Sequence, residues 1–481
     1  MKWSTILRYI GISLLMLASL MTVSGAVALL NDGDDSMRPL FFSAALTFIA
    51  GAFPLIFTRQ KGEISAREGY YIVVLSWIAS CLFGTTPYLC YGEGFNFTDA
   101  LFESISGFTT TGASILDDIE ALPAGLHFWR MSTAWVGGIG IVTLFSMMIP
   151  RKFDRHSVLS GTEISSLARS QSSLKASSFV RKVILIYIGM TVTCSLLLWI
   201  SGLSLFDAVT CAMSSCSTCG FCIRNASIAA YDNLAAEMVM MLFMVLCGIS
   251  FAQLFSFMQS PGKSRLLGSE VVRTYLMIIL IATVVTSADL IISHTYGNPL
   301  TALRMASFQV CSLITTTGFA TTDTSVWPQL SVLTLIIVSV VCGCSGSTAG
   351  GFKIDRLVIV AKNCRNELEL LRRPNVVRNV TLNGKILHGD VSRRVFVFMV
   401  LYVLLIAAGS MVNATFGTDL RTGVTAAVAC AGNVGPGFGQ VGSVSNYADL
   451  PDILKYNSMA LMFLGRLEIF PVLYILGGRR R

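Results

Sequence analysis

Charged residues are scarce in this sequence. Only 13% of its 481 residues are Asp, Glu, Lys or Arg, whereas hydrophobic types make up 53%. A soluble domain carries about 25% charged residues, so this chain cannot cover a water-facing surface. The apolar residues instead gather in runs of about 20, which are long enough to cross a bilayer as helices. These features exclude a soluble enzyme, a disordered chain and a small secreted domain held together by disulfides.

The sequence also lacks the signatures of several chemistries. It contains no Walker loop and no dinucleotide-binding fingerprint, so we find no site for energy conversion. The Cys-x-x-Cys-x-x-Cys series at 216–222 has zinc-like spacing, but no second pair or nearby His completes a four-ligand site. The few histidines are isolated along the chain: His127, His156, His294 and His388. We therefore expect neither enzymatic activity nor a resident cofactor.

Basic residues mark one side of the predicted spans. The net charge of +8 is explained by basic inner loops rather than by nucleic-acid binding, because Lys and Arg accumulate at cytoplasmic loops. Two N-terminal spans are predicted at 5–30 and 39–58, followed by the anchors Arg59 and Lys61. The first run could be a cleaved signal peptide, but it is longer than an ordinary signal sequence, which favours an uncleaved span. Further basic loops, down to Arg479–Arg481, place both termini in the cytoplasm.

One pattern then recurs four times along the chain. Each unit has a span, a half-length amphipathic segment, a turn, an outer loop and a second span. The predicted pairs of spans are 70–91 and 125–150, 183–203 and 234–259, 273–296 and 330–360, and 393–415 and 453–477. The short segments, the first at 98–109, have about 12 residues and cannot cross a bilayer. A segment that turns back inside a membrane must be buried in protein or line a water-filled cavity.

These units predict an all-α polytopic membrane protein. Four span–pore helix–span repeats would stand in a pseudo-fourfold arrangement, with two additional N-terminal spans. The predicted boundaries are 1–60 for the N-terminal spans and 61–155, 156–262, 263–375 and 376–481 for the four repeats.

The turns of the four repeats align on one glycine. We call the aligned quartets the filter turns: Thr109-Thr110-Thr111-Gly112, Ser217-Thr218-Cys219-Gly220, Thr315-Thr316-Thr317-Gly318 and Gly432-Asn433-Val434-Gly435. Serine also recurs six residues before the glycine, as Ser106, Ser214 and Ser312. Helix-capping glycines in tight turns are the simpler explanation for any single turn. Four such turns at equivalent places favour a shared function.

An ion filter is the function that fits these turns. A permeating cation loses water, and rings of backbone carbonyls replace that water in potassium-selective pores. Glycine allows the unusual backbone conformation that such carbonyls require. The predicted filter residues, with K⁺ as their ligand, are Thr110, Thr111, Gly112, Thr218, Cys219, Gly220, Thr316, Thr317, Gly318, Asn433, Val434 and Gly435.

Three segments carry a resemblance to a known family: 308–319 (FQVCSLITTTGF), 346–353 (GSTAGGFK) and 465–470 (GRLEIF). With them the chain resembles TrkH-type subunits of the Trk/Ktr/HKT superfamily of potassium transporters. The resemblance implies potassium uptake across the bacterial inner membrane, a homodimer with two pores, and a cytosolic TrkA-like regulatory subunit that binds nucleotides. It also implies that Gly112 favours potassium, whereas Cys219 and Asn433 depart from the family pattern and leave the degree of selectivity open.

The last predicted feature is a gate. Residues 342–353, which we call the gate loop, interrupt the second span of the third repeat with glycines that disfavour helix by about 1 kcal/mol each. A kink, or close helix packing through small residues, is one explanation. The resemblance implies instead a flexible loop that blocks the pore beneath the filter. The predicted gating residues are Gly343, Gly346, Ser347, Thr348, Ala349, Gly350, Gly351, Lys353 and Arg466.

Intramembrane charges decide between two modes of transport. Arg466 would cost about 2.5–3.5 kcal/mol if it faced lipid, so it should face the bundle or the pore. It either pairs with an acid such as Glu468 or, as the resemblance implies, projects into the pore as a barrier. We favour a channel-like mechanism. A symporter coupled to H⁺ or Na⁺ is the alternative, with Glu103 and Glu468 as its candidate acids.

Overall fold

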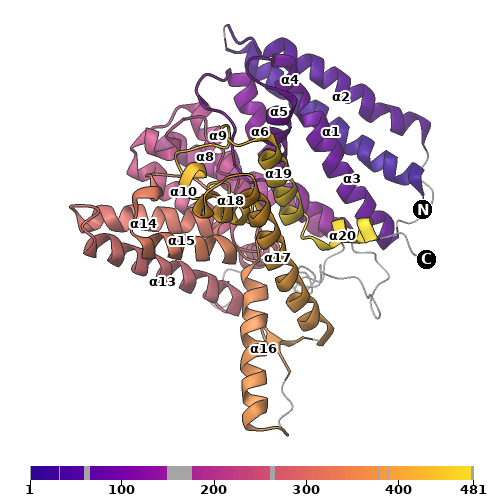
Figure 1. Ribbon diagram of the computed structural model, residues 1–481. Helices are drawn as coiled ribbons and strands as arrows, with labels where there is room; N and C mark the ends of the chain where they lie inside the picture. Colours follow the sequence, from indigo (N-terminus) through magenta and orange to yellow (C-terminus); the bar gives the residue numbers. More distant parts are fainter. Residues whose placement is uncertain are drawn as a thin grey trace.

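The computed structural model of the chain describes residues 2–31, 33–58, 65–148, 176–259, 266–375, 379–387 and 389–477. Helices dominate this part of the chain (Figure 1). Many basic residues that orient the predicted spans lie outside the described residues, as do two of the histidines: Arg59, Lys61, Arg151, Lys152, Arg155, His156, Lys263, Arg265, Arg378, His388 and Arg479–Arg481.

The two N-terminal helices form a hairpin at one side of the molecule. Helices α1 (Trp3–Leu29) and α2 (Met37–Phe57) run beside each other at the indigo end of the colour scale (Figure 1). A Cβ added to Gly11 would lie 2.6 Å from the carbonyl oxygen of Gly51, so the two backbones approach closely where both residues are glycine. Small residues at such crossings are typical of helix pairs in membranes.

The remaining helices follow the predicted order of the four repeats. The first two repeats contain α3 (Ala66–Gly84), α4 (Thr86–Tyr91), α5 (Phe97–Phe108), α6 (Ala124–Met148), α8 (Ala176–Ile200), α9 (Leu205–Ser217), η1 (Ser227–Tyr231), α10 (Leu234–Cys247) and α11 (Phe251–Gln259). The last two contain α13 (Glu270–Ile292), α14 (Pro299–Ile314), η2 (Thr324–Val326), α15 (Gln329–Val341), α16 (Ile354–Arg372), the hairpin β1 (Thr381–Leu382) and β2 (Lys385–Ile386), α17 (Gly389–Thr415), α18 (Leu420–Gly432), η3 (Gly439–Val441), α19 (Asp452–Arg466) and α20 (Phe470–Gly477).

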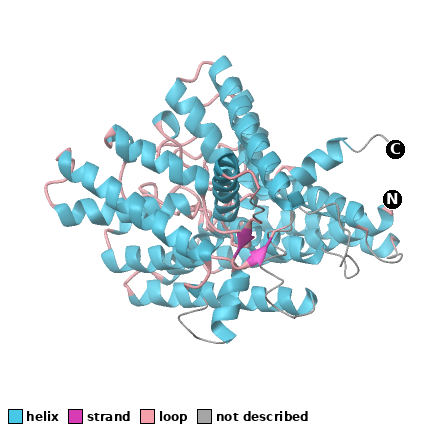
Figure 2. Cartoon of the chain, turned by 90° about the horizontal axis from the view of Figure 1, so that it is seen from below, coloured by secondary structure: helices cyan, strands magenta, loops and turns pink. Residues whose placement is uncertain are grey.

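Long apolar helices confirm the prediction of an all-α membrane protein. Within the described residues, six helices are long and apolar enough to cross a membrane, or up to eight if each bent pair counts as one span. The short helices α5, α9, α14 and α18 lie inside this shell, and most of their side chains are buried. Seen from below, helices surround a central zone of loops (Figure 2).

Two predicted spans are not continuous. The predicted span 234–259 bends by 99° between α10 and α11, and the predicted span 453–477 bends by 106° between α19 and α20. Gly248 lies at the first bend, where it weakens the helix. At the second bend Glu468 and Ile469 both have positive φ, which ends the helical path. Each stretch is apolar enough as a whole to pass for one span, so hydropathy did not reveal these breaks.

The predicted span 330–360 is interrupted, as its glycines indicated, and it also ends differently from the prediction. Helix α15 stops at Val341, and α16 begins at Ile354 after the gate loop. Helix α16 continues to Arg372 and projects from the body of the molecule (Figure 1). It carries many charged residues, so only the α15 part of this region is apolar in the manner of a span.

Candidate functional site

The four filter turns share one backbone conformation. Left-handed residues occupy the same place in each turn, at φ 51°, 54°, 57° and 54°: Thr110, Thr218, Thr316 and Asn433. In each turn the next residue donates its N–H to the carbonyl five residues earlier, at 2.9, 3.1, 2.8 and 2.8 Å. The glycine that follows again has positive φ, between 77° and 94°. A left-handed β-branched residue is uncommon, so the three threonines indicate backbones held by their surroundings.

The glycines of these turns meet one another in a closed ring. A Cβ added to each glycine would collide with the carbonyl oxygen of a neighbouring turn. The pairs are Gly112 with Cys219 (1.8 Å), Gly220 with Thr317 (1.8 Å), Gly318 with Val434 (2.2 Å) and Gly435 with Thr111 (2.4 Å). The order is therefore first to second, second to third, third to fourth and fourth to first. This cyclic order supports the predicted pseudo-fourfold arrangement, and it requires glycine at all four places.

An outer cavity opens above the ring. Its volume is about 160 Å³, and all four filter glycines line it. The remaining lining comes mostly from the segments that follow the glycines, including Ala113, Phe221 and Pro436. Carbonyl oxygens and glycine backbones thus form the floor of a space that is open to the outer loops. Glycine keeps side chains away from the ring itself, whereas Arg130, Phe221 and Tyr447 also line the cavity.

The short helices α5, α9, α14 and α18 are capped at their N-terminal ends, and their C-terminal ends lead to the ring. Each first turn is capped by a side chain that accepts a backbone N–H: Asn96, Ser204, Asn298 and Asp419. The C-terminal ends of α5, α9, α14 and α18 run directly into the filter turns. Helix dipoles place partial negative charge at these ends, which favours a cation there.

The aligned serines behave differently in different repeats. Ser106 donates to the carbonyl of Ala113 at 2.6 Å, and Ser312 donates to the carbonyl of Phe319 at 2.8 Å. Both acceptors directly follow a filter glycine. Each serine therefore links its short helix to the segment that leaves the turn. The hydroxyl of Ser214 has no hydrogen-bond partner among the described residues.

Asn433 replaces the threonine of the other turns and joins three elements. Its amide donates to the hydroxyl of Thr111 at 3.0 Å and to the carbonyl of Met462 at 2.9 Å. The fourth turn is thereby linked to the first turn and to α19. Asparagine also adopts a left-handed conformation more readily than threonine, so this departure from the pattern preserves the turn.

The gate loop contacts the filter turns on the side away from the outer cavity. The N–H of Gly350 donates to the hydroxyl of Thr316 at 2.9 Å. The hydroxyl of Thr348 lies 3.2 Å from the carbonyl of Cys216 and 3.3 Å from that of Cys247. A Cβ on Gly350 would lie 2.4 Å from the carbonyl oxygen of Gly432. The loop is thus packed against the second, third and fourth repeats.

Arg466 connects the gate loop to the first repeat. It is 3% exposed, and its guanidinium donates to the carbonyl of Thr348 at 2.8 Å and to that of Gly137 in α6 at 3.0 Å. Its Nε atom is buried without a partner among the described residues. Glu468 pairs with Arg356 at 2.6 Å, so the predicted alternative of an Arg466–Glu468 pair is wrong. Arg466 is held by carbonyl groups rather than by an acid.

The other predicted gating residues lie in the same loop. Gly346 and Gly351 have positive φ, and a Cβ on Gly343 would lie 2.7 Å from the side chain of Ala349. The ammonium of Lys353 donates to the carbonyl of Ala349. Ser347 donates to the carbonyl of Cys344 at 2.6 Å. The loop is therefore closed by its own hydrogen bonds as well as by its neighbours.

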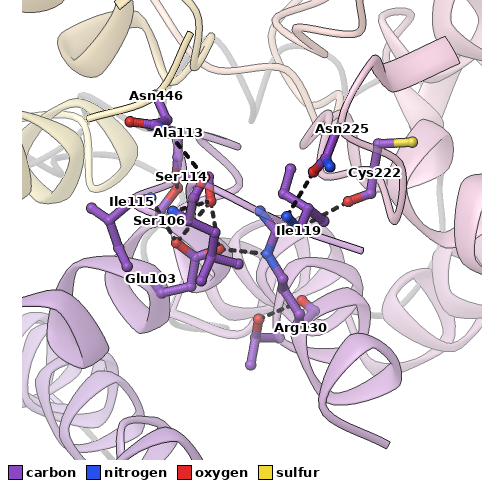
Figure 3. Close-up of polar contacts among 12 residues, drawn as sticks. Glu103, Ser106, Ala113, Ser114, Ile115, Ile119, Arg130, Cys222, Asn225 and Asn446 are labelled. Carbon is purple, nitrogen blue, oxygen red and sulfur yellow. Dashed lines mark hydrogen bonds and ion pairs between the residues drawn. The ribbon is translucent and has the colours of Figure 1, made fainter. Parts of the chain in front are cut away.

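A buried ion pair that the sequence reasoning missed stands beside the outer cavity. Glu103 accepts a hydrogen bond from Nε of Arg130 at 2.5 Å, and both side chains are almost fully buried (Figure 3). Arg130 lies within a predicted span, so the argument applied to Arg466 would have singled it out. Glu103 is therefore paired, which weakens its candidacy as a coupling acid.

The cysteines near the second turn form no evident metal site. Cys216, Cys219 and Cys222 are buried free thiols. Within the described ranges, no group of three or more His, Cys, Asp or Glu side chains is arranged to hold a metal ion.

Comparisons with known proteins place the chain in a family. Residues 38–476 match the TrkH family, described as cation transport protein. The Trk system potassium uptake protein TrkH of Salmonella typhimurium is 30% identical over 479 residues, covering 99% of this chain and 98% of the relative. TrkH of Escherichia coli strain K12 is 29% identical with the same coverage. The crystal structure of the potassium transporter TrkH from Vibrio parahaemolyticus matches with a TM-score of 0.90 and 28% identity over 99% of both chains. The chain belongs to the TrkH family of cation transport proteins.

Proposed function

We propose that this chain carries K⁺ into a bacterial cell through a carbonyl-lined filter in the inner membrane. The closed ring of filter turns, with four glycines at the floor of the outer cavity, carries the proposal. The names of the relatives, which describe potassium uptake, point to the same ion. An inside-negative potential would drive uptake, since each charge moved inward gains about 2.3 kcal/mol per 100 mV.

In this proposal the filter replaces the water of the ion. The carbonyls of Thr111, Cys219, Thr317 and Val434 contribute one oxygen from each repeat, and the neighbouring layer adds the carbonyls of the preceding residues, three of which are threonines that also carry a hydroxyl. The pore-helix ends add negative potential at the same place. Cys219 and Val434 contribute through their backbones, so their side chains need not match threonine.

The gate is the second part of the proposal. The gate loop and Arg466 close the path beneath the filter, because the loop bonds to the second and third repeats and Arg466 bonds to the loop and to the first. The positive charge of Arg466 adds an electrostatic barrier to a cation. Opening would require the loop to leave Thr316 and Cys216.

A channel-like mechanism is favoured over coupled transport. The two candidate coupling acids, Glu103 and Glu468, are both held in ion pairs, with Arg130 and Arg356 respectively. A symporter coupled to H⁺ or Na⁺ stays the alternative, and an acid freed from its pair during transport would be its signature.

Orientation and partners complete the proposal. The backbone N–H of Lys2 donates to Glu68 at 2.9 Å, and the rings of Tyr70 and Tyr474 lie 5.2 Å apart. The starts of α1 and α3 and the helix α20 are thus neighbours, which agrees with two termini on one side, and the basic segments assign that side to the cytoplasm. By family resemblance we propose a homodimer and a TrkA-like nucleotide-binding subunit on this face.

Flux in proteoliposomes that contain only this protein tests the function. K⁺ and Na⁺ gradients are imposed with a defined voltage, with and without a pH gradient. Voltage-driven K⁺ flux that exceeds Na⁺ flux and needs no second ion gradient would support the proposal. Flux that demands H⁺ or Na⁺ would favour the symporter. If no flux is observed, the gate-loop deletion described in the Discussion is measured next. Absence of K⁺ flux in that variant as well would contradict the proposal.

A further inference from the structure

The ion pair beside the outer cavity breaks the fourfold pattern. Glu103 lies in α5, nearly a full helix length before Gly112. The residues at the same offset from the other filter glycines are Cys211, Gln309 and Ala426. Only the first repeat therefore has an acid at this place. The pair therefore acts at the first repeat and its neighbour rather than equally at all four turns.

Glu103 forms hydrogen bonds with the segment that leaves the first filter turn. Its carboxylate accepts hydrogen bonds from the hydroxyl of Ser114 at 3.3 Å and from the N–H of Ile115 at 3.3 Å (Figure 3). Both donors follow Gly112 within three residues. The carboxylate is 0% exposed. Its position therefore fixes where the first turn emerges into the outer cavity.

Arg130 extends the same contact to the second filter turn. Its Nη1 atom donates to the carbonyl of Cys222 at 2.8 Å, and its guanidinium lies 3.7 Å from the centre of the Phe221 ring. Phe221 and Cys222 directly follow Gly220. Arg130 also lines the outer cavity. Through Glu103 on one side and Cys222 on the other, the guanidinium of Arg130 thus links the segments that follow the first and second filter glycines.

Charge compensation is the second property of the pair. An unpaired arginine at the cavity wall would repel a cation that approaches the ring. Glu103 at 2.5 Å cancels this field locally, and each buried charge has hydrogen-bonding partners, which buried ions require. The arrangement positions two turns without leaving net charge at the mouth.

We propose that Glu103 and Arg130 are positioning residues that set the spacing between the first and second filter turns, and with it the preference for K⁺ over Na⁺. The inference rests on the proposed potassium function and adds a specificity-determining pair to it. Neither residue contributes an oxygen to the ion. Glu103 acts through the hydroxyl of Ser114 and the N–H of Ile115, and Arg130 acts through the carbonyl of Cys222 and the ring of Phe221.

A second ion pair in the same protein provides a matched control. Arg304 of α14 donates to Glu237 of α10 through Nε at 2.7 Å and through Nη2 at 2.8 Å. This pair also joins two neighbouring repeats, and the carboxylate is 3% exposed. Its residues do not line the outer cavity. Loss of this pair should weaken packing without altering the filter.

The test compares the ratio of K⁺ to Na⁺ permeability in proteoliposomes. Glu103→Gln and Arg130→Gln should each lower the ratio by about tenfold, because hydrogen bonds to charged groups are among the stronger ones. Glu237→Gln and Arg304→Gln should leave it within about twofold, the change expected from a distant and independent site. Parental ratios in folded Glu103 and Arg130 variants would overturn the inference.

Milder variants keep the test decisive if the glutamine variants fail to fold. Arg130→Lys retains the charge but offers one nitrogen in place of the Nε and Nη1 atoms that bond Glu103 and Cys222, and Ser114→Ala removes the hydroxyl that bonds Glu103. Each should lower the ratio by about threefold, in line with one weaker bond. Parental ratios in both would overturn the inference. A parent chain without K⁺ preference would instead contradict the proposed function.

Discussion

The two sides of the filter ring follow opposite rules. On the outer side, the four turns adopt the same conformation, with the same hydrogen bond in each, although the second and fourth differ from the Thr-Thr-Thr-Gly sequence that the first and third share. On the inner side, each repeat takes its own path: α6 continues unbroken to Met148, α10 and α11 meet at 99°, the third repeat inserts the gate loop, and α19 and α20 meet at 106°. The four repeats have equivalent backbones at the ring, where an ion would bind, and different backbones directly beneath it.

Under the proposed function, this contrast separates the selection of the ion from the control of its passage. A ring of ligands must surround the ion evenly, so every repeat is held to one geometry. A gate needs one movable part and fixed partners for it. The gate loop contacts both breaks. The N–H of Cys344 donates to the carbonyl of Gly248 at 2.9 Å, and Arg466, directly before the second break, donates to the carbonyl of Thr348 in the loop.

The largest effect should come from breaking the equivalent side. Gly220→Ala would place a Cβ 1.8 Å from the carbonyl oxygen of Thr317, at a positive φ that alanine resists. Because a backbone atom cannot yield, we expect K⁺-selective flux to be abolished. The control is Gly189→Ala, a position with no atom within 4 Å of an added Cβ. Selective flux in a folded Gly220→Ala protein would contradict the ring.

Removing the movable part should have the next largest effect. Deletion of Gly346–Gly350 eliminates the contacts to Thr316, Cys216 and Arg466. Three hydrogen bonds at about 1 kcal/mol each correspond to about a hundredfold shift in favour of the open path. Leak flux of K⁺ in proteoliposomes measures the change. Unchanged leak in a folded and inserted protein would mean that the loop is not the gate.

Removing the charge that joins the loop to the first repeat should have a smaller effect. Arg466→Ala leaves the loop in place but removes its bond to Thr348 and the field that opposes a cation. We expect K⁺ flux to rise about tenfold, because one charge near the path contributes a few kcal/mol at most at an effective dielectric of about 20. Arg365→Ala, whose side chain is 77% exposed on α16, is the control. Equal or lower flux would contradict the barrier.

The smallest effect should come from the aligned serines, whose substitution tests whether the repeats stabilise their filter turns in the same way. Ser312→Ala removes the bond to Phe319 and should lower the free energy of unfolding by about 0.5–1.5 kcal/mol. Ser214→Ala removes a hydroxyl without a partner in the described structure and should change little. Thermal unfolding of the two purified variants compares them. Equal losses would mean that the second repeat holds its turn through an unseen partner.

Sequence reasoning predicted the outer side better than the inner side. The short helices, their glycines and the aligned serines recur in the sequence, so comparison within the chain located them. The α10–α11 and α19–α20 bends occur in only two of the four repeats, and each pair of helices is apolar enough to pass for one span. Helix ends inside a protein depend on tertiary contacts that hydropathy does not record, such as the bond from Arg466 to the loop.

The partners of single charges were the other part that the sequence could not supply. Arg466 and Glu468 are close enough in the chain to suggest a pair, yet Arg466 donates to the carbonyls of Thr348 and Gly137 whereas Glu468 pairs with Arg356. Arg130 and Glu103 are 27 residues apart, and their pairing depends on how α5 lies against α6. Spacing along a helix predicts contacts within that helix only.

The closed ring has a consequence for how such a pore can change over time. A channel built from four identical subunits receives every substitution four times, so a small alteration is multiplied around its axis. Here each glycine meets the carbonyl of a different turn on the same polypeptide, and one codon alters one quarter of the ring. Cys219, Asn433 and Val434 illustrate this freedom, because the second and fourth turns carry other side chains than the two Thr-Thr-Thr-Gly turns and still follow the same backbone path.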